Sequence, residues 1–190
     1  MSGVAFSHVD DAGEQRSSRL RDGSTITIPL HRRGRARPAR AFLQALSLTA
    51  RRLRFFTGAV DIATAAHLTA ATGPDRLGLL ALDERGEIVG HALCIELDPS
   101  CAEVAVEVAD RLHGQGLGTL LVVRLAVLAE RHGISRFVAE VLADNDEMLD
   151  VFRDGFDARV AWREGVEAVE FPTSAWRLAR ERYPEVVRAP

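Results

Sequence analysis

Three glycines near the middle of the chain, Gly114, Gly116 and Gly118, alternate with other residues where a valine-rich stretch gives way to a leucine-rich one. Glycine lets the backbone approach a ligand closely, because no side chain stands in the way. A helix that begins directly after such a turn adds N–H groups without partners and the positive end of its dipole. The spacing therefore predicts an anion site that suits a phosphate or a diphosphate.

The residues around these glycines exclude two common phosphate motifs. A Walker loop needs a Lys before its Ser or Thr, and all 24 basic residues of this chain are Arg. A dinucleotide fingerprint needs the spacing G-x-G-x-x-G, and Thr119 stands where its third glycine would be. The pattern that remains is Arg111-x-x-Gly114-x-Gly116. A tight strand-to-helix connection without a ligand is the alternative interpretation.

Two acids, Glu103 and Glu107, precede the glycine turn on a predicted strand. Side chains alternate along a strand, so one face carries residues 101, 103, 105 and 107, and the other carries Val104, Val106 and Val108. A carboxylate in a cleft could accept a proton from an amine, since an amine of pKa ~10.4 is neutral in only about one molecule in a thousand at pH 7. The alternative is a solvated acid on an edge strand, with no part in the chemistry.

The apolar periodicity and the turn residues predict strands and helices in mixed order. Strands are predicted at residues 24–28, 77–82, 87–97, 101–109, 137–142, 158–162 and 166–171. Helices are predicted at residues 39–56, with a break near Ser47, and at 61–71, 116–132, 145–153 and 175–183. Because strands and helices do not alternate strictly, the order indicates a mixed α/β fold rather than a doubly wound sheet.

The length of 190 residues allows one domain with short tails. Residues 1–20 are polar and are expected to be disordered, residues 21–172 form the domain, and residues 173–190 form a tail or a helix. No secretory signal or membrane-spanning stretch is visible, and Cys94 and Cys101 are too few for a disulfide framework. We expect a cytoplasmic protein without a metal site.

The basic residues are concentrated in one part of the chain. Residues 16–54 contain eleven Arg and a single acid, Asp22. Such a segment can bind nucleic acid, but no nucleic-acid motif accompanies this one. We therefore expect the Arg-rich segment at residues 31–54 to pair with acids elsewhere or to face solvent, and we expect neither nucleic acid nor a membrane as a partner.

The pattern at residues 111–116 resembles the coenzyme A loop, (Gln/Arg)-x-x-Gly-x-(Gly/Ala), of the GNAT acetyltransferase superfamily. The resemblance covers roughly residues 23–171 and is greatest to the acetyltransferase domains of bacterial Pat-type protein lysine acetyltransferases. The matching stretches are DGSTITI (22–28), LRFF (53–56), AEVA (102–105), GQGLG (114–118) and FVAEVL (137–142). The resemblance implies a GNAT fold: a central, mostly antiparallel sheet of six to seven strands, splayed between its fourth and fifth strands, with about four flanking helices.

The resemblance also implies acetyl-CoA as the cosubstrate, without a metal, and its diphosphate on the glycine turn. The matching positions of this turn are Arg111, His113, Gly114, Gln115, Gly116, Gly118 and Thr119. In the family, the pantetheine arm lies in the gap between the splayed strands and pairs with the backbone, here near Val106 and Val108. Asn145 matches a position that often contacts the coenzyme.

Glu103 falls on the catalytic glutamate position of the Pat-type family and is the expected general base. A β-bulge, usual in this strand of the family, would free a backbone N–H near Val106 or Val108 for the oxyanion of the reaction. The chain departs from the family at two positions. Phe152 stands where many members carry a Tyr that protonates the leaving thiolate, and the turn before Gly155 is one residue shorter than usual.

The resemblance predicts an acetyl-CoA-dependent N-acetyltransferase that acts on an amine, with a protein lysine as the first choice of acceptor. A small-molecule amine is the second choice. A non-catalytic acyl-CoA-binding module is a third interpretation, which Phe152 and the shortened turn favour. The edge strands of such folds could also pair with a second copy to form a homodimer.

Overall fold

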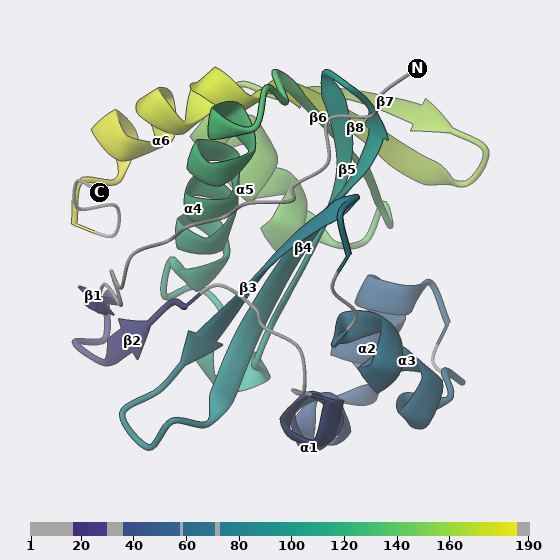
Figure 1. Cartoon of the computed structure of the whole chain (residues 1–190), viewed down its shortest axis with the longest axis vertical. Coiled ribbons are helices and arrows are strands. Elements are labelled where there is room, and N and C mark those ends of the chain that lie inside the picture. Colours follow the sequence, from purple (N-terminus) through teal and green to yellow (C-terminus); the bar gives the residue numbers. More distant parts are fainter. Residues whose placement is uncertain (1–16, 30–35, 58, 71–72, 186–190) are drawn as a thin grey trace.

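A computed structural model describes residues 17–29, 36–57, 59–70 and 73–185, and this part of the chain forms one open sheet with helices on both faces (Figure 1). The strands, in the sheet order β1-β2-β3-β4-β5-β6-β8-β7, are β1 (Ser17–Arg19), β2 (Thr25–Thr27), β3 (Arg76–Leu82), β4 (Ile88–Asp98), β5 (Cys101–Val108), β6 (Arg136–Val141), β8 (Val166–Pro172) and β7 (Arg159–Arg163). The helices are α1 (Ala36–Ala45), α2 (Leu48–Phe55), α3 (Ile62–Thr69), α4 (Leu117–Arg131), α5 (Asp146–Phe156) and α6 (Trp176–Arg182).

The mixed α/β architecture predicted from the sequence is confirmed, but the described residues form more elements than expected. The sheet has eight strands where the resemblance implies six to seven, and there are six helices where it implies about four. These six helices correspond to the helical stretches predicted from the apolar periodicity, since the break near Ser47 divides residues 39–56 into two. The eighth strand is β1, which pairs with β2 from Ser17↔Thr27 to Arg19↔Thr25 in a segment predicted to be disordered. A strand of three residues is too short to show a period in the sequence. Residues 1–16, the rest of that segment, lie outside the described residues.

The helices form two layers, one on each face of the sheet (Figure 1). The larger core lies between the sheet and α4, α5 and α6, and it includes four almost completely buried rings, Phe137, Phe152, Phe156 and Phe171. A smaller core joins α1 and α3 through residues such as Leu43. α4 is apolar around most of its circumference because it packs against the sheet and is covered by other elements.

The helices around the sheet begin in two different ways. Ser47 Oγ accepts a hydrogen bond from the Ala50 N–H at 3.0 Å, so the predicted break near Ser47 is the N-cap of α2. Asp61 and Asn145 cap α3 and α5 with their own side chains. α4 instead follows Gly116, whose φ is 87° and which has no side chain to cap with. The N–H groups of the first turn of α4 are therefore left for another partner.

The sheet splits between β5 and β6. The two strands pair in parallel only from Cys101↔Arg136 to Glu103↔Val138, although both continue beyond these residues. β6 then keeps its antiparallel pairing with β8 as far as Val141↔Glu167. This is the splayed pair that the resemblance implies, and it leaves one edge of β5 open after Glu103.

The bulge expected near Val106 and Val108 is not present. β4 and β5 stay in one register from Gly90↔Val108 to Glu96↔Ala102, and the shift in their pairing comes only afterwards, between Glu96 and Asp98. Side chains therefore alternate regularly along this part of β5, as the sequence pattern predicts.

Candidate active site

A cleft of about 330 Å³ lies beside the open edge of β5. Leu53 and Arg54 of α2 line one side, Val106 and Val108 line the strand side, and the first residues of α4 and α5 complete it. The cleft thus brings α2 and the start of α5 to β5 and α4, which follow one another in the chain. Its position is the one where the sequence pattern predicts an anion site.

The backbone of β5 faces the open edge at alternate residues. The Ala109 N–H donates to the Val89 carbonyl, towards β4, at 2.8 Å, and the Arg136 N–H of β6 donates to the Ser100 carbonyl at 3.0 Å. The backbone N–H and C=O groups of successive residues point to opposite edges of a strand, so those of the even-numbered residues of β5 point towards β6. Past the last parallel pair, the residues that face this edge without pairing to β6 are Val106 and Val108. The splay frees them without a bulge.

The glycine turn and the start of α4 form the end of the cleft. Gly114 and Gly116 adopt φ values of 70° and 87°, which side chains disfavour. Gly118 also lines the cleft, and a Cβ added there would have only Val151 Cγ2 nearby, at 3.8 Å. The start of α4, next to Thr119, therefore offers N–H groups and a positive dipole end on a surface that is open to a ligand.

His113 and Asn145 also line the cleft, and each makes contacts that shape it. His113 Nε2 lies 3.2 Å from the Val108 carbonyl oxygen, and its Nδ1 lies 3.0 Å from Glu147 Oε2 on α5. The ring thus links β5 to α5 across the cleft. Asn145 Oδ1 accepts a hydrogen bond from the Met148 N–H at 3.3 Å, so it holds the start of α5 in place.

Two residues of the predicted coenzyme loop, Arg111 and Gln115, do not line the cleft. Arg111 Nη2 donates to Asp83 Oδ2 in the β3–β4 turn at 2.9 Å. The Gln115 carbonyl accepts a hydrogen bond from the Arg21 N–H at 3.3 Å. Arg21 itself lines the cleft, although it precedes Gly114 by 93 residues. No local pattern in the sequence indicates that Arg21 belongs to the site.

Glu107 is buried beneath α2 and does not act as a free acid. Its Oε2 accepts a hydrogen bond from Arg54 Nε at 2.6 Å, and its Oε1 lies 3.0 Å from His91 Nδ1. Burial works to raise the pKa of Glu107, but the charges and hydrogen bonds of Arg54 and His91 lower it to about 2. So weakly basic a carboxylate is poorly suited to accept a proton from an amine.

Glu103 is exposed and lies where β5 and β6 begin to part. It forms the last parallel pair with Val138 and pairs with Ile95 of β4. By strand alternation its side chain is on the same face as Glu107, the face that α2 covers further along the strand. Glu103 does not line the cleft itself; it precedes Val106 by three residues, or ~10 Å along the strand.

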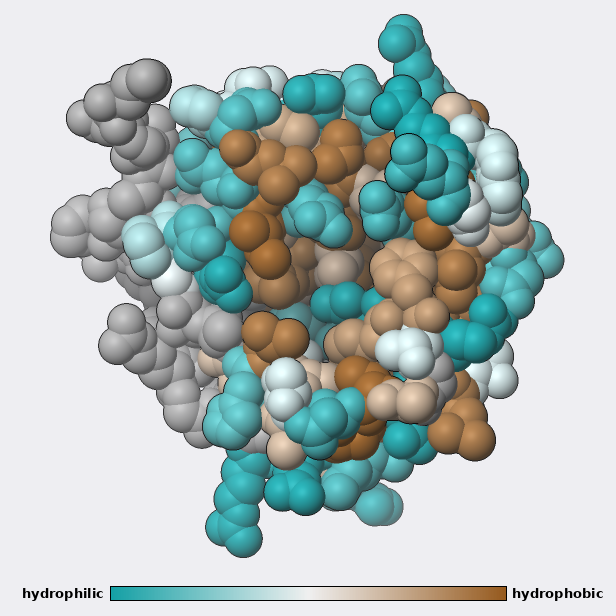
Figure 2. All heavy atoms as spheres, turned by 90° about the vertical axis from the view of Figure 1, so that its right-hand side faces the viewer, coloured by the Kyte–Doolittle hydropathy of each residue, from teal (hydrophilic) through white to brown (hydrophobic). Residues whose placement is uncertain are grey.

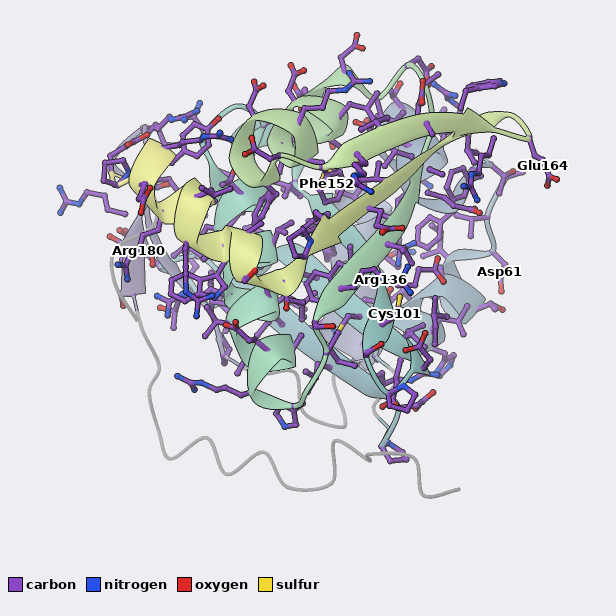
Figure 3. All side chains as sticks on the ribbon, turned by 90° about the horizontal axis from the view of Figure 1, so that it is seen from above. Asp61, Cys101, Arg136, Phe152, Glu164 and Arg180 are labelled. Carbon is purple, nitrogen blue, oxygen red and sulfur yellow. The ribbon has the colours of Figure 1, made fainter. Side chains whose placement is uncertain are left out.

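The two positions at which the chain departs from the family, Phe152 and Gly155, both lie in α5. Phe152 points into the core between α5 and the sheet, where its ring centroid lies 5.3 Å from that of Phe171 (Figure 3). α5 continues through Phe156, so Gly155 lies inside its last turn rather than after the helix. Tyr183 lines the cleft near Gly155, at the end where the glycine turn lies.

The two thiols, Cys94 and Cys101, are free and buried. Burial raises the pKa of Cys94 to about 12 and also raises the pKa of Cys101, so both stay protonated near neutral pH. Among the described residues, no group of three His, Cys, Asp or Glu side chains could hold a metal ion. In the same part of the chain, no helix combines the length and the apolar character needed to cross a membrane.

Comparisons with known proteins agree with this arrangement. A model of the acetyltransferase (GNAT) family matches residues 45–156. The structure is similar to the GNAT domain of S. lividans PAT, with a TM-score of 0.75 and 29% identity over 83% of this chain and 96% of that chain.

Two further structures share the fold at lower identity. Spermidine N-acetyltransferase from Vibrio cholerae, in complex with CoA and spermine, has a TM-score of 0.59 and 15% identity over 80% of this chain and 98% of that chain. A cAMP-binding acyltransferase from Mycobacterium smegmatis has a TM-score of 0.56 and 22% identity over 88% of this chain, which spans 54% of that protein's chain. With more than half of its residues matched by the family model, and with the splayed sheet and glycine turn described above, the chain belongs to the GNAT acetyltransferase family.

Proposed function

We propose that the protein transfers the acetyl group of acetyl-CoA to the side-chain amine of a protein lysine. The observation that carries the proposal is the start of α4, where an uncapped helix of 15 residues follows the glycine turn and opens into a cleft beside a split sheet. A diphosphate fits this end because it can accept hydrogen bonds from the N–H groups that no side chain caps.

The residues that would hold the coenzyme are those that line the cleft. His113, Gly114, Gly116, Gly118 and Thr119 would surround the diphosphate. The backbone groups of Val106 and Val108, which face the open edge of β5, would pair with the amides of the pantetheine arm. Asn145 would contact the coenzyme from the start of α5. Arg111 and Gln115 are left out of this proposal because they do not line the cleft.

Glu103 is the proposed general base. The bound coenzyme supplies an activated acetyl thioester, and the protein must supply a neutral amine to attack it. Glu103 would accept a proton from the ammonium group of the acceptor, directly or through water, which is worth roughly 10²- to 10⁴-fold in rate. The N–H groups of Val106 and Val108, which follow Glu103 along the open edge of β5, can donate to the oxygen that becomes negative during the transfer.

The leaving thiolate would take its proton from water. Phe152 has no proton to donate and is buried in the core. Tyr183 packs next to Gly155, at the end of the cleft where the glycine turn lies and away from Glu103. A thiol pKa of ~8.5 makes an unassisted thiolate a tolerable leaving group near neutral pH.

A protein acceptor is favoured by the similarity to the GNAT domain of S. lividans PAT and by the surface of α2 and α3. Leu48 and Phe56 at the two ends of α2, and Leu68 on α3, are exposed apolar side chains. Figure 2 views the molecule from the side of these helices, where apolar and charged side chains are mixed. A mixed surface of this kind suits a folded protein or a peptide better than it suits a small polyamine.

The test measures thiol release from acetyl-CoA with a panel of lysine peptides, intact proteins and polyamines. The expected result is turnover on lysine peptides or proteins, and a loss of at least 100-fold in Glu103→Gln with unchanged coenzyme affinity. Glu84→Gln, at the tip of the β3–β4 turn, is the matched control and should keep full activity. Turnover on polyamines alone would show that the acceptor is a small-molecule amine rather than a protein lysine. Coenzyme binding without thiol release would favour a non-catalytic binding module.

A further inference from the structure

We propose that Arg21, in the turn between β1 and β2, is the cation that binds the phosphates of the coenzyme, a role for which the loop pattern points to Arg111. The inference rests on the proposed function, since it concerns the same cleft. Arg21 lies outside residues 45–156, the region matched by the family model.

Arg21 is attached directly to the glycine turn. Its backbone N–H donates to the Gln115 carbonyl at 3.3 Å, and its Nη1 donates to the Gly114 carbonyl at 3.2 Å. These two bonds connect the β1–β2 turn to the residues that lead into α4. They place the guanidinium in the lining of the cleft, next to Gly114 and Gly116.

The C-terminal part of the described chain holds Arg21 in place from another side. The Arg21 guanidinium carbon lies 5.5 Å from the centroid of the Tyr183 ring, and Nη2 lies 3.5 Å from Glu185 Oε1. The Arg21 side chain remains 43% exposed, so it can still reach a ligand. A guanidinium that is already positioned loses less conformational entropy when it binds a phosphate.

The charges of the cleft show why this position matters. Arg21 and Arg54 are the two arginines among the described residues that line the cleft, and Arg54 is bound to the buried Glu107. Arg111 is engaged with Asp83 outside the cleft. The α5 side of the cleft contributes three acids, Glu147, Asp150 and Asp154. A diphosphate would meet these negative charges, and Arg21 is the cation placed to offset them.

The first experiment compares coenzyme A binding by calorimetry in the wild type, Arg21→Gln, Arg111→Gln and Arg19→Gln. Arg19 is exposed on the neighbouring β1 and does not line the cleft, so it is the matched control. Loss of a charge-assisted bond to phosphate should weaken the affinity of Arg21→Gln by about 10- to 100-fold. Arg19→Gln and Arg111→Gln should stay within about twofold of the wild type.

The second experiment separates a phosphate contact from a structural role. S-acetyl-pantetheine carries the thioester but neither the diphosphate nor the nucleotide, so Arg21→Gln should use it as well as the wild type does. Equal losses with acetyl-CoA and S-acetyl-pantetheine would overturn the inference, as would wild-type coenzyme affinity in Arg21→Gln or the large loss appearing in Arg111→Gln instead. If Arg21→Gln does not fold, Arg21→Lys tests the inference instead. Lys keeps the positive charge but lacks the planar guanidinium that binds phosphate through two hydrogen bonds, so this variant should bind coenzyme A with intermediate affinity. A wild-type protein that binds no coenzyme A would instead contradict the proposed function.

Discussion

Arg54 and Glu107 are 53 residues apart in the chain, and the Arg54 Nε hydrogen bond to Glu107 Oε2 joins α2 to β5. The Glu107 side chain is 3% exposed and the Arg54 side chain 20% exposed, so the pair is largely shielded from water. His91 contacts the other carboxylate oxygen. One buried carboxylate thus fixes the helix that forms a wall of the cleft.

This contact predicts a large stability loss for Glu107→Gln. The substitution leaves Arg54 and His91 facing a neutral amide, and breaking a buried pair costs about 3 kcal/mol of the free energy of unfolding. Urea denaturation at pH 7 measures the loss. Glu140→Gln changes an exposed acid of β6 and should stay within about 0.5 kcal/mol of the wild type. Equal stability of the two variants would show that the pair contributes nothing.

The same carboxylate predicts a defined response to acid. Its pKa falls from 4.5 to about 2 on folding, so the unfolded chain binds the proton more readily than the native one. The stabilisation by Glu107 is therefore complete above pH 4.5 and is lost as the pH falls towards 2. Denaturation curves of the wild type and Glu107→Gln should differ by a constant amount from pH 6 to 8 and converge below ~pH 4. A gap that widens in acid would contradict the assignment.

Phe152→Tyr should not create a proton donor for the thiolate. The Phe152 side chain is 2% exposed and packs on Phe171, so a hydroxyl there would be buried in an apolar environment without a hydrogen-bond partner. We expect a loss of about 1–3 kcal/mol in stability and an unchanged kcat for acetyl transfer at temperatures where the variant is folded. A higher kcat would mean that position 152 reaches the reacting atoms after all.

Gly118→Ala should weaken coenzyme binding without lowering the stability of the protein. Alanine is favoured over glycine in a helix by about 1 kcal/mol, and a Cβ at this position would meet no atom closer than 3.8 Å. The variant should therefore melt at or above the wild-type temperature and yet bind coenzyme A about tenfold more weakly, because its methyl group lies on the cleft surface. Gly116→Ala is the comparison: its φ of 87° should cost about 1–2 kcal/mol in stability as well. Wild-type affinity in Gly118→Ala would place the coenzyme elsewhere.

The parts of the site that were predictable from the sequence are those set by local pattern. The alternation along β5 and the apolar stretch of α4 are visible over a few residues, and the structure has both elements at the predicted place. Arg21 and Tyr183 could not be predicted, because only the folded chain brings the β1–β2 turn and the C-terminal segment to the glycine turn. The partners of Glu107 and Arg111 could not be predicted for the same reason. Periodicity does not show which residues that are far apart in the chain come into contact when it folds.

The absence of lysine predicts resistance to self-acetylation. An active enzyme of this sequence has no side-chain amine to modify, since every basic residue other than its six His is Arg. After incubation with acetyl-CoA, the intact mass should rise by no more than one acetyl group, at a free α-amino group. Several additions that are stable to hydroxylamine and map to nitrogen would contradict this.

If the uncapped start of α4 binds the coenzyme as proposed, the survival of the protein depends on its coenzyme supply. A ligand that supplies the missing hydrogen-bond acceptors binds only the native chain. At a free ligand concentration of a hundred times Kd, it adds about 2.7 kcal/mol to the free energy of unfolding. Proteases act on the opened chain, so molecules that are starved of coenzyme should be degraded faster than loaded ones. The lifetime of the enzyme would then follow the metabolic state of the cell without any separate sensor.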